Sequence, residues 1–133
     1  MKRNFVIVVI TLAAIFAMLA VPVQAADMQN QKYPDVVKVT VQARGQNGFD
    51  FDVTISSPYD TPQRYADAFR VMSHDGVSYG ERILLHDHAS EQPFARELNG
   101  VHIPPGVQAV VVQARDKKHG YGGKAMQILL PGR

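Results

Sequence analysis

Two histidines separated by one residue, His86 and His88, are the residues of this sequence best suited to carry chemistry. Asp87 lies between them, and Glu91 follows shortly after. In a β-strand, residues i and i+2 point to the same face, so two imidazoles with this spacing can bind one ligand together. Because apolar residues precede the pair, we expect one long strand over residues 77–88 that presents both rings on one side.

The composition restricts which ligand such a pair could bind. The sequence has no cysteine, which excludes thiolate catalysis and metal ligation by thiolate sulfur. Imidazole and carboxylate ligands suit Zn²⁺ or Cu²⁺ best. His119, in a glycine-rich segment, is the candidate third ligand, and water, Glu91 or Asp116 could take the remaining position. The hypothesis is therefore one zinc or copper(II) ion held mainly by three histidines.

The same residues also have a purely structural interpretation. A His-Asp-His sequence at a strand end can form a polar rim, in which each imidazole bonds to a carboxylate or a backbone carbonyl. A His-x-His pair with a distant third histidine is far less specific than the spacing of a zinc finger. Both interpretations therefore stay open. For His74 and His102, which are expected in turns at the opposite end of the domain, the structural role is favoured.

The N-terminal segment has the features of a targeting signal. Lys2 and Arg3 provide positive charge, residues 5–21 are almost continuously apolar, and Val23-Gln24-Ala25 supplies a small-residue cleavage pattern. An uncleaved membrane anchor is the alternative, because the apolar run approaches the ~18 residues that a membrane span requires. The expected organisation is a signal peptide over residues 1–25, a flexible leader over 26–35 and one domain over 36–133.

Export changes the charge of the domain and limits its partners. Removal of Lys2 and Arg3 leaves equal numbers of basic and acidic residues, so the formal net charge falls from +2 to zero. A neutral domain lacks the basic surface that nucleic-acid binding needs. Without cysteines, a small exported domain must be stabilised by its apolar core alone. We therefore expect a periplasmic or secreted protein that binds no nucleic acid and contacts membrane only through an uncleaved signal segment.

Alternating apolar and polar residues predict an all-β fold. In residues 37–43 and 49–55, apolar side chains occupy every second position, and the turn-forming segment Gly45-Gln46-Asn47-Gly48 separates the two runs. Five further strands are expected over residues 68–72, 77–88, 94–98, 107–115 and 124–130. About seven short strands with almost no helix predict an antiparallel β-sandwich.

Parts of the sequence resemble known β-sandwich domains. The run GVQAVVVQARDKKHGYGG, followed by a last strand, resembles the final hairpin of fibronectin type III and related immunoglobulin-like domains. The segments HDHASEQPF (86–94) and ARDKKHGYGG (114–123) resemble small exported bacterial β-sandwich proteins of uncharacterised function. The resemblance implies an immunoglobulin-like sandwich and brings no established activity. The cysteine pair and core tryptophan of immunoglobulin domains are absent.

An immunoglobulin-like topology would place alternate connections at the same end of the sandwich. The loops over residues 57–64, 89–93 and 116–123 would then share one pole. The three candidate histidines would meet there, although they are far apart in the sequence. This convergence is the basis of the metal hypothesis.

Two functions of different kinds are compatible with these features. One is an exported binding domain that holds zinc or copper. The other is a protein-interaction or structural module of the cell envelope without metal, whose contact surface would include Tyr59, Tyr65 and Tyr121, since tyrosine is favoured at interfaces. No hydrolase elbow, phosphate-binding loop or zinc-protease helix motif is present, so we do not expect an enzyme.

Overall fold

The first strong turn of the sequence connects two strands in a hairpin, as predicted. In the computed structural model, which describes residues 30–133, β1 (Asp35–Arg44) pairs with β2 (Gly48–Ser56) in antiparallel register. Val39 lies opposite Val53, and Val41 lies opposite Phe51. β2 also pairs with β5 (Phe94–His102), which gives a three-stranded sheet in the order β1-β2-β5.

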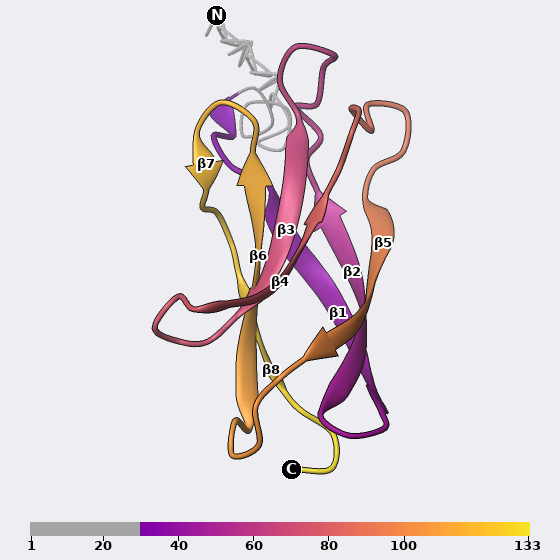
Figure 1. Cartoon of the computed structure of the whole chain (residues 1–133). Coiled ribbons are helices and arrows are strands. Elements are labelled where there is room, and N and C mark those ends of the chain that lie inside the picture. Colours follow the sequence, from indigo (N-terminus) through magenta and orange to yellow (C-terminus); the bar gives the residue numbers. More distant parts are fainter. Residues whose placement is uncertain (1–29) are drawn as a thin grey trace, which may run out of the picture.

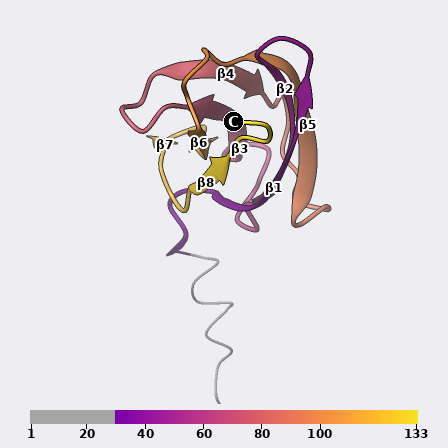
Figure 2. The same ribbon diagram turned by 90° about the horizontal axis from the view of Figure 1, so that it is seen from below.

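The remaining strands form a second antiparallel sheet. β3 (Ala66–Met72) lies between β4 (Ser78–Ile83) and β6 (Ala109–Asp116). The two-residue β7 (Gly120–Tyr121) and β8 (Met126–Leu129) both pair with β6. The two sheets face each other and enclose a common interior (Figures 1 and 2). The described fold is therefore all-β, with eight strands in two packed sheets.

The core lies between the two sheets and is made by the alternation seen in the sequence. Phe51, Phe69 and Phe94 are the largest of the fully buried side chains. They come from β2, β3 and β5, so both sheets contribute to the same interior. Burial of apolar surface is the main favourable term in folding, and this chain has no disulfide to add to it.

β4 ends earlier than the sequence predicts. A strand was expected over residues 77–88, but β4 stops at Ile83, and residues 84–90 form a loop. The His88 N–H donates to the Asp60 carboxylate (2.9 Å) rather than to a neighbouring strand. Because His86 and His88 are not on a strand, the expectation that strand geometry places both rings on one face is wrong.

β5 is longer than the sequence predicts. A turn was expected at Asn99-Gly100, but the strand continues through both residues to His102. Gly100 has φ +66°, a left-handed conformation that glycine adopts without strain, and its N–H donates to Asp50 (2.8 Å). The β2–β5 register shifts at this point, between Phe49 and Phe51. The glycine therefore makes a bulge within the strand instead of a turn.

The chain is packed against the domain from the start of the described residues. Pro34 is buried, and the Tyr33 ring lies so close to Gly122 that a Cβ there would come within 2.5 Å of it. Residues 31–35 were predicted as the end of a flexible leader. Tyr33 and Pro34 lie against Gly122 and Gly123, just after β7, and β1 already begins at Asp35. The predicted signal peptide (1–25) lies outside the described residues. From residue 30 onward, no helix is long and apolar enough to cross a membrane.

Candidate functional site

Three loops and the entry of the chain meet at one end of the sandwich, which we call the leader pole (residues 30–33, 57–65, 84–93 and 116–120; Figure 1). Direct hydrogen bonds join these segments. The Lys117 N–H donates to the Tyr65 carbonyl (2.9 Å), and the Ser57 N–H donates to the Gln92 side chain (2.8 Å). The loops that the sequence placed at one pole therefore do meet there.

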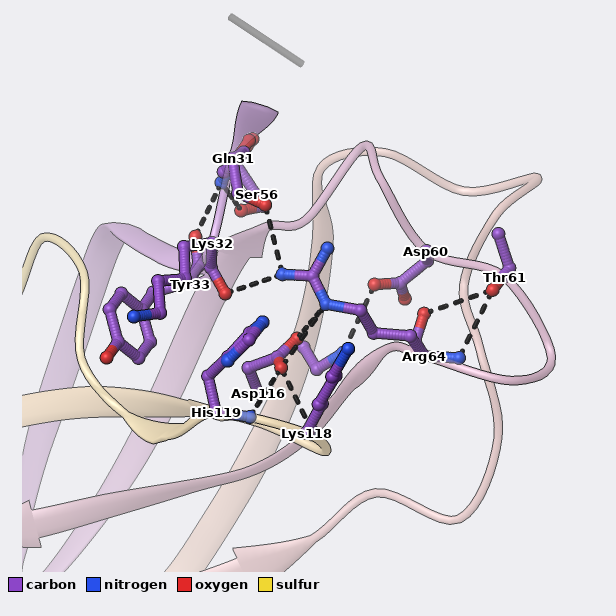
Figure 3. Close-up of polar contacts among 11 residues, drawn as sticks. Gln31, Lys32, Tyr33, Ser56, Asp60, Thr61, Arg64, Asp116, Lys118 and His119 are labelled. Atoms are coloured by element: carbon purple, nitrogen blue, oxygen red, sulfur yellow. Dashed lines mark hydrogen bonds and ion pairs between the residues drawn. The ribbon is translucent and has the colours of Figure 1, made fainter. Parts of the chain in front are cut away.

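Asp116 is a fully buried charged residue of the leader pole. Its side chain is 0% exposed, and its carboxylate lies 3.2 Å from Arg64 Nε. The N–H groups of Lys118 and His119 donate to Oδ2 at 3.0 and 2.8 Å (Figure 3). Burial alone would raise the pKa of Asp116, but the adjacent Tyr59 hydroxyl, the two amides and the Arg64 charge outweigh burial and lower the pKa. Asp116 is therefore an ionised structural anchor.

Arg64 connects this anchor to the start of the domain. Its Nη2 donates to the carbonyls of Gln31 (3.0 Å) and Lys32 (2.6 Å), as Figure 3 shows. The guanidinium also lies over the Tyr59 ring, 4.0 Å from its centroid. A planar guanidinium can bond two carbonyls and a carboxylate at once, which the point charge of a lysine would do less well. The chain thus enters the domain through an Arg64–Asp116 clasp.

Tyr59 is half-buried beside this clasp, with its hydroxyl oxygen buried. Its hydroxyl lies next to the Asp116 carboxylate, but no group within the described residues meets the distance and angle criteria for a hydrogen bond with it. Burial, together with that negative charge, raises the pKa of Tyr59. The phenol therefore stays neutral at physiological pH and serves as packing under Arg64.

Asp60 fixes the other two loops of the pole to each other. It is 5% exposed, and its two oxygens accept separate bonds from the N–H groups of Ala66 (3.1 Å) and His88 (2.9 Å). Burial raises the pKa of Asp60, while the bonds from those two amides oppose the increase. One carboxylate therefore holds loop 84–93 against loop 57–65.

His86 and His88 lie together in spite of the early end of β4. Their ring centroids are 4.8 Å apart, and the His88 ring stacks on Phe94 at 3.8 Å with 9° between the planes. His88 is 5% exposed, and its Nδ1 has no hydrogen-bond partner in the described part of the chain. Burial, followed by the positive charges of Arg96 and His86, lowers the pKa of His88. His88 is therefore a neutral ring packed at the edge of the core.

The lowered pKa of His88 predicts a loss of stability in mild acid. In the unfolded chain a histidine has a pKa of about 6.5. When its pKa is lower in the folded state, the histidine contributes to the stability of the fold above a pH of about 6.5, and this contribution is lost as the pH falls through the folded pKa. We expect the free energy of unfolding to fall between pH 7 and pH 5, and to fall less in His88→Gln. Urea denaturation at several pH values measures this, with the exposed His74→Gln as control. The same pH dependence in all three proteins would contradict the prediction.

The three predicted histidine ligands do not come together. The His119 ring packs edge-to-face on Tyr33, with centroids 6.2 Å apart. Glu91 pairs with Arg96 (3.2 Å), and Asp116 is held by the clasp. Across residues 30–133, no group of three or more His, Asp or Glu side chains is placed to hold a metal ion. The predicted zinc or copper site therefore has no support in this part of the chain.

The three tyrosines of the alternative interaction surface are half-buried. Each lies beneath a cation: Arg64 over Tyr59 at 4.0 Å, Lys117 over Tyr65 at 4.9 Å and Arg70 over Tyr121 at 3.9 Å. Each ring therefore already contacts a cation of its own chain. A surface built on these tyrosines stays a prediction.

A shallow hollow lies beside the histidine pair, where β4 ends and β5 begins. We call it the β4 hollow; its volume is about 150 Å³, and it is lined by Arg82, Ile83, Leu84, Leu85, His86, His88 and Arg96. Leu85 is 83% exposed and Ile83 is 49% exposed. A larger hollow, about 260 Å³, is lined by mostly polar side chains of β1, β2 and β5 and offers little apolar contact. The β4 hollow therefore combines exposed aliphatic side chains with two guanidinium groups.

Two residues that organise the leader pole, Asp60 and Arg64, were not singled out from the sequence. They lie in a loop with Pro58 and Pro62, where polar side chains ordinarily contact water. Their partners, His88 for Asp60 and Asp116 for Arg64, are 28 and 52 positions away in the sequence, so no local sequence pattern predicts these contacts. The only available signal was topological, because the loops that contain the partners were expected at the same pole.

Comparison with known proteins gives one informative match. A protein of Halomicrobium mukohataei described as "Putative lipoprotein" is 40% identical to this chain over 94 residues, which are 71% of this chain and 46% of that protein. The chain thus spans about half the length of the curated relative that it matches. No family model and no solved structure matches the chain.

Proposed function

We propose that the chain is an exported, non-enzymatic binding domain of the cell envelope, periplasmic or secreted, with an immunoglobulin-like fold. Two features support export: the signal-like N-terminal sequence and the lipoprotein description of the Halomicrobium relative. The strand order supports the fold type. One antiparallel sheet has the order β1-β2-β5 and the facing sheet has the order β4-β3-β6-β8, so the chain passes from one sheet to the other between β2 and β3, between β4 and β5, and between β5 and β6. None of the 133 residues is a cysteine, so the proposal includes no sulfur-linked lipid.

The β4 hollow is the observation that carries the binding role. Leu85 is 83% exposed and Ile83 is 49% exposed. Contiguous exposed apolar side chains rimmed by polar residues mark interaction sites. Arg82 and Arg96 line the same hollow. Arginine is enriched at protein interfaces. The hollow therefore suits a protein segment that offers an aliphatic side chain and an adjacent carboxylate.

The edge position of β4 adds a second means of contact. Among the described strands, β4 pairs only with β3, so its other edge is available for backbone hydrogen bonds. Val77, immediately before the strand, is 59% exposed. A partner in extended conformation could add to this edge and place a side chain in the hollow at the end of the strand. The proposed partner is thus an extended segment of another envelope protein.

The charged groups of the leader pole support a role without catalysis. Asp60 and Asp116 are buried and accept hydrogen bonds from backbone amides, Asp116 also pairs with Arg64, and Glu91 pairs with Arg96. A general acid or base must reach a substrate proton, and these carboxylates face their own chain. The pole is therefore a rigid support for the binding surface.

Photo-crosslinking in cells tests the proposal. With a photoreactive residue at position 85 of the full chain, we expect one discrete adduct of higher mass in the envelope fraction. Leu129, which is 76% exposed on β8, is the matched control position and should give no such adduct. Identical adducts from both positions, or none from position 85, would contradict the proposed surface.

A single substitution separates binding from folding. Leu85→Ser should change the free energy of unfolding by less than about 0.5 kcal/mol, because an 83% exposed side chain loses little burial. The same substitution should abolish the adduct formed from a photoreactive residue at position 83. An adduct that persists in Leu85→Ser would show that the hollow is not the contact.

A further inference from the structure

We propose that one side of the leader pole, the side that carries Lys32, Lys117 and Lys118, lies against an anionic lipid surface through these three side chains. The proposal shares the export step of the proposed function but does not depend on the β4 hollow. All three lysines are exposed, and they come from two segments that the Arg64–Asp116 clasp holds together. Figure 3 shows Lys32 and Lys118 on the two sides of this clasp. The result is a fixed basic surface made from residues far apart in the sequence.

The positive charge of this surface is not compensated by nearby carboxylates. Within residues 30–133, none of the three lysines has a carboxylate oxygen within 4.0 Å of its amino group. Two acidic residues of the same pole, Asp60 and Asp116, are both buried. Asp116 is also neutralised by Arg64. The exposed part of this pole is therefore positive although the whole domain is close to neutral.

The acidic residues of the remaining loop are engaged locally. On loop 84–93, Glu91 pairs with Arg96, and Asp87 accepts a hydrogen bond from the Ala89 N–H (3.1 Å). They belong to the side of the pole that borders the β4 hollow. The lysine surface and the hollow are thus two separate surfaces, so membrane contact through the lysines leaves the hollow open to a partner.

Aromatic rings accompany two of the lysines. The Lys117 amino group lies 4.9 Å from the Tyr65 ring centroid, and the Lys32 amino group lies 5.5 Å from the Tyr33 ring centroid. Tyrosine and lysine side chains are both suited to the interface between lipid headgroups and water. Each lysine near an anionic membrane strengthens contact by roughly fivefold, so three can orient a tethered domain.

The point at which the chain enters the domain also favours this orientation. Residue 30 lies at the leader pole, and the preceding sequence contains the apolar residues 5–21. Residues 22–29 can span at most about 28 Å when fully extended. If the apolar segment stays in the bilayer, the leader pole is the end of the domain held near the lipid. The lysines would then meet headgroups rather than solvent.

Energy transfer to labelled vesicles tests the contact with the full chain. Because the chain has no cysteine, Gln63→Cys places one fluorophore at the leader pole, and Gln46→Cys places one in the β1–β2 turn at the opposite end. Vesicles carry a headgroup acceptor and contain phosphatidylcholine with or without phosphatidylglycerol. We expect strong transfer from position 63, weak transfer from position 46, and a clear decrease of the position-63 signal when phosphatidylglycerol is left out.

Charge-matched variants decide whether the three lysines are responsible. In Lys32→Gln/Lys117→Gln/Lys118→Gln, the equilibrium constant for contact should fall by roughly 10- to 100-fold. The control Lys38→Gln/Arg44→Gln/Lys124→Gln removes the same charge elsewhere and should keep the transfer of the wild type. Transfer unchanged in the first variant, equal in the two variants, or equal on zwitterionic vesicles would overturn the proposal. Because both variants keep the β4 hollow and the N-terminal sequence, such a failure would not be a failure of the proposed function.

Discussion

Replacing Asp116 with alanine is expected to lower the free energy of unfolding by about 3–5 kcal/mol, the usual cost of removing one partner of a buried ion pair. The substitution leaves Arg64 without its carboxylate and the N–H groups of Lys118 and His119 without an acceptor. Each unsatisfied buried group adds its own desolvation penalty. Denaturant titration of the full chain measures the change.

Two comparisons show whether the clasp is the cause. Asp75→Ala, in the exposed β3–β4 turn, should change the free energy of unfolding by less than about 0.5 kcal/mol. The difference between wild type and Asp116→Ala should shrink in strong acid. Because the folded pKa of Asp116 is lowered, its contribution is present above the unfolded value of about 3.9 and is lost as the pH falls through the folded pKa. A small effect at neutral pH would mean that Arg64 finds other partners.

Replacing Asp60 with alanine should cost about 2–4 kcal/mol, because two buried amides lose their only acceptor and each unsatisfied group costs about 1–3 kcal/mol. These are the N–H groups of Ala66 and His88. Amide hydrogen exchange adds a local readout, since the His88 N–H should lose protection while the N–H of Val53, in the centre of β2, keeps it.

The exposed Asp52 provides a matched control for Asp60. It lies on β2 with its side chain outward, so Asp52→Ala should be close to neutral. Asp60→Asn retains one acceptor oxygen and should have an intermediate effect. An alanine variant of Asp60 as stable as that of Asp52 would show that loop 84–93 is held by packing alone.

Local alternation predicts much of this fold because each strand has one face on the core. The hairpin of β1 and β2 follows from apolar residues at every second position and a glycine-rich turn. β3, β6 and β8 also lie where alternation placed them, within a few residues. A strand that is buried on one side is thus encoded by its own residues.

The errors occur where a distant side chain decides the local structure. β4 stops at Ile83, and further along the loop the Asp60 carboxylate, and not a strand, accepts the His88 amide. β5 continues through Gly100 because Asp50 accepts its N–H within a bulge. Neither interaction produces a pattern in its own segment, so periodicity could not have found them.

In the candidate site, too, the sequence predicted the general arrangement but not the side-chain contacts. Sequence and topology placed three loops at one pole, and the structure joins them there through Asp60 and Asp116. The side chains expected to be functional were three histidines with Glu91 or Asp116 as a metal ligand, whereas Asp116 instead acts with Asp60 and Arg64 to hold the pole together. His86 and His88 do lie together at 4.8 Å, but His119 contacts Tyr33 instead of them.

The account depends most on export of the domain, and the absence of cysteine allows this to be measured directly. The full chain with Gln63→Cys should react with a membrane-impermeant maleimide in intact cells, while a cytoplasmic thiol protein in the same cells stays unlabelled. The predicted result is labelling without lysis. Labelling of position 63 only after the cells are broken would place the domain inside the cell and contradict both the envelope function and the lipid contact.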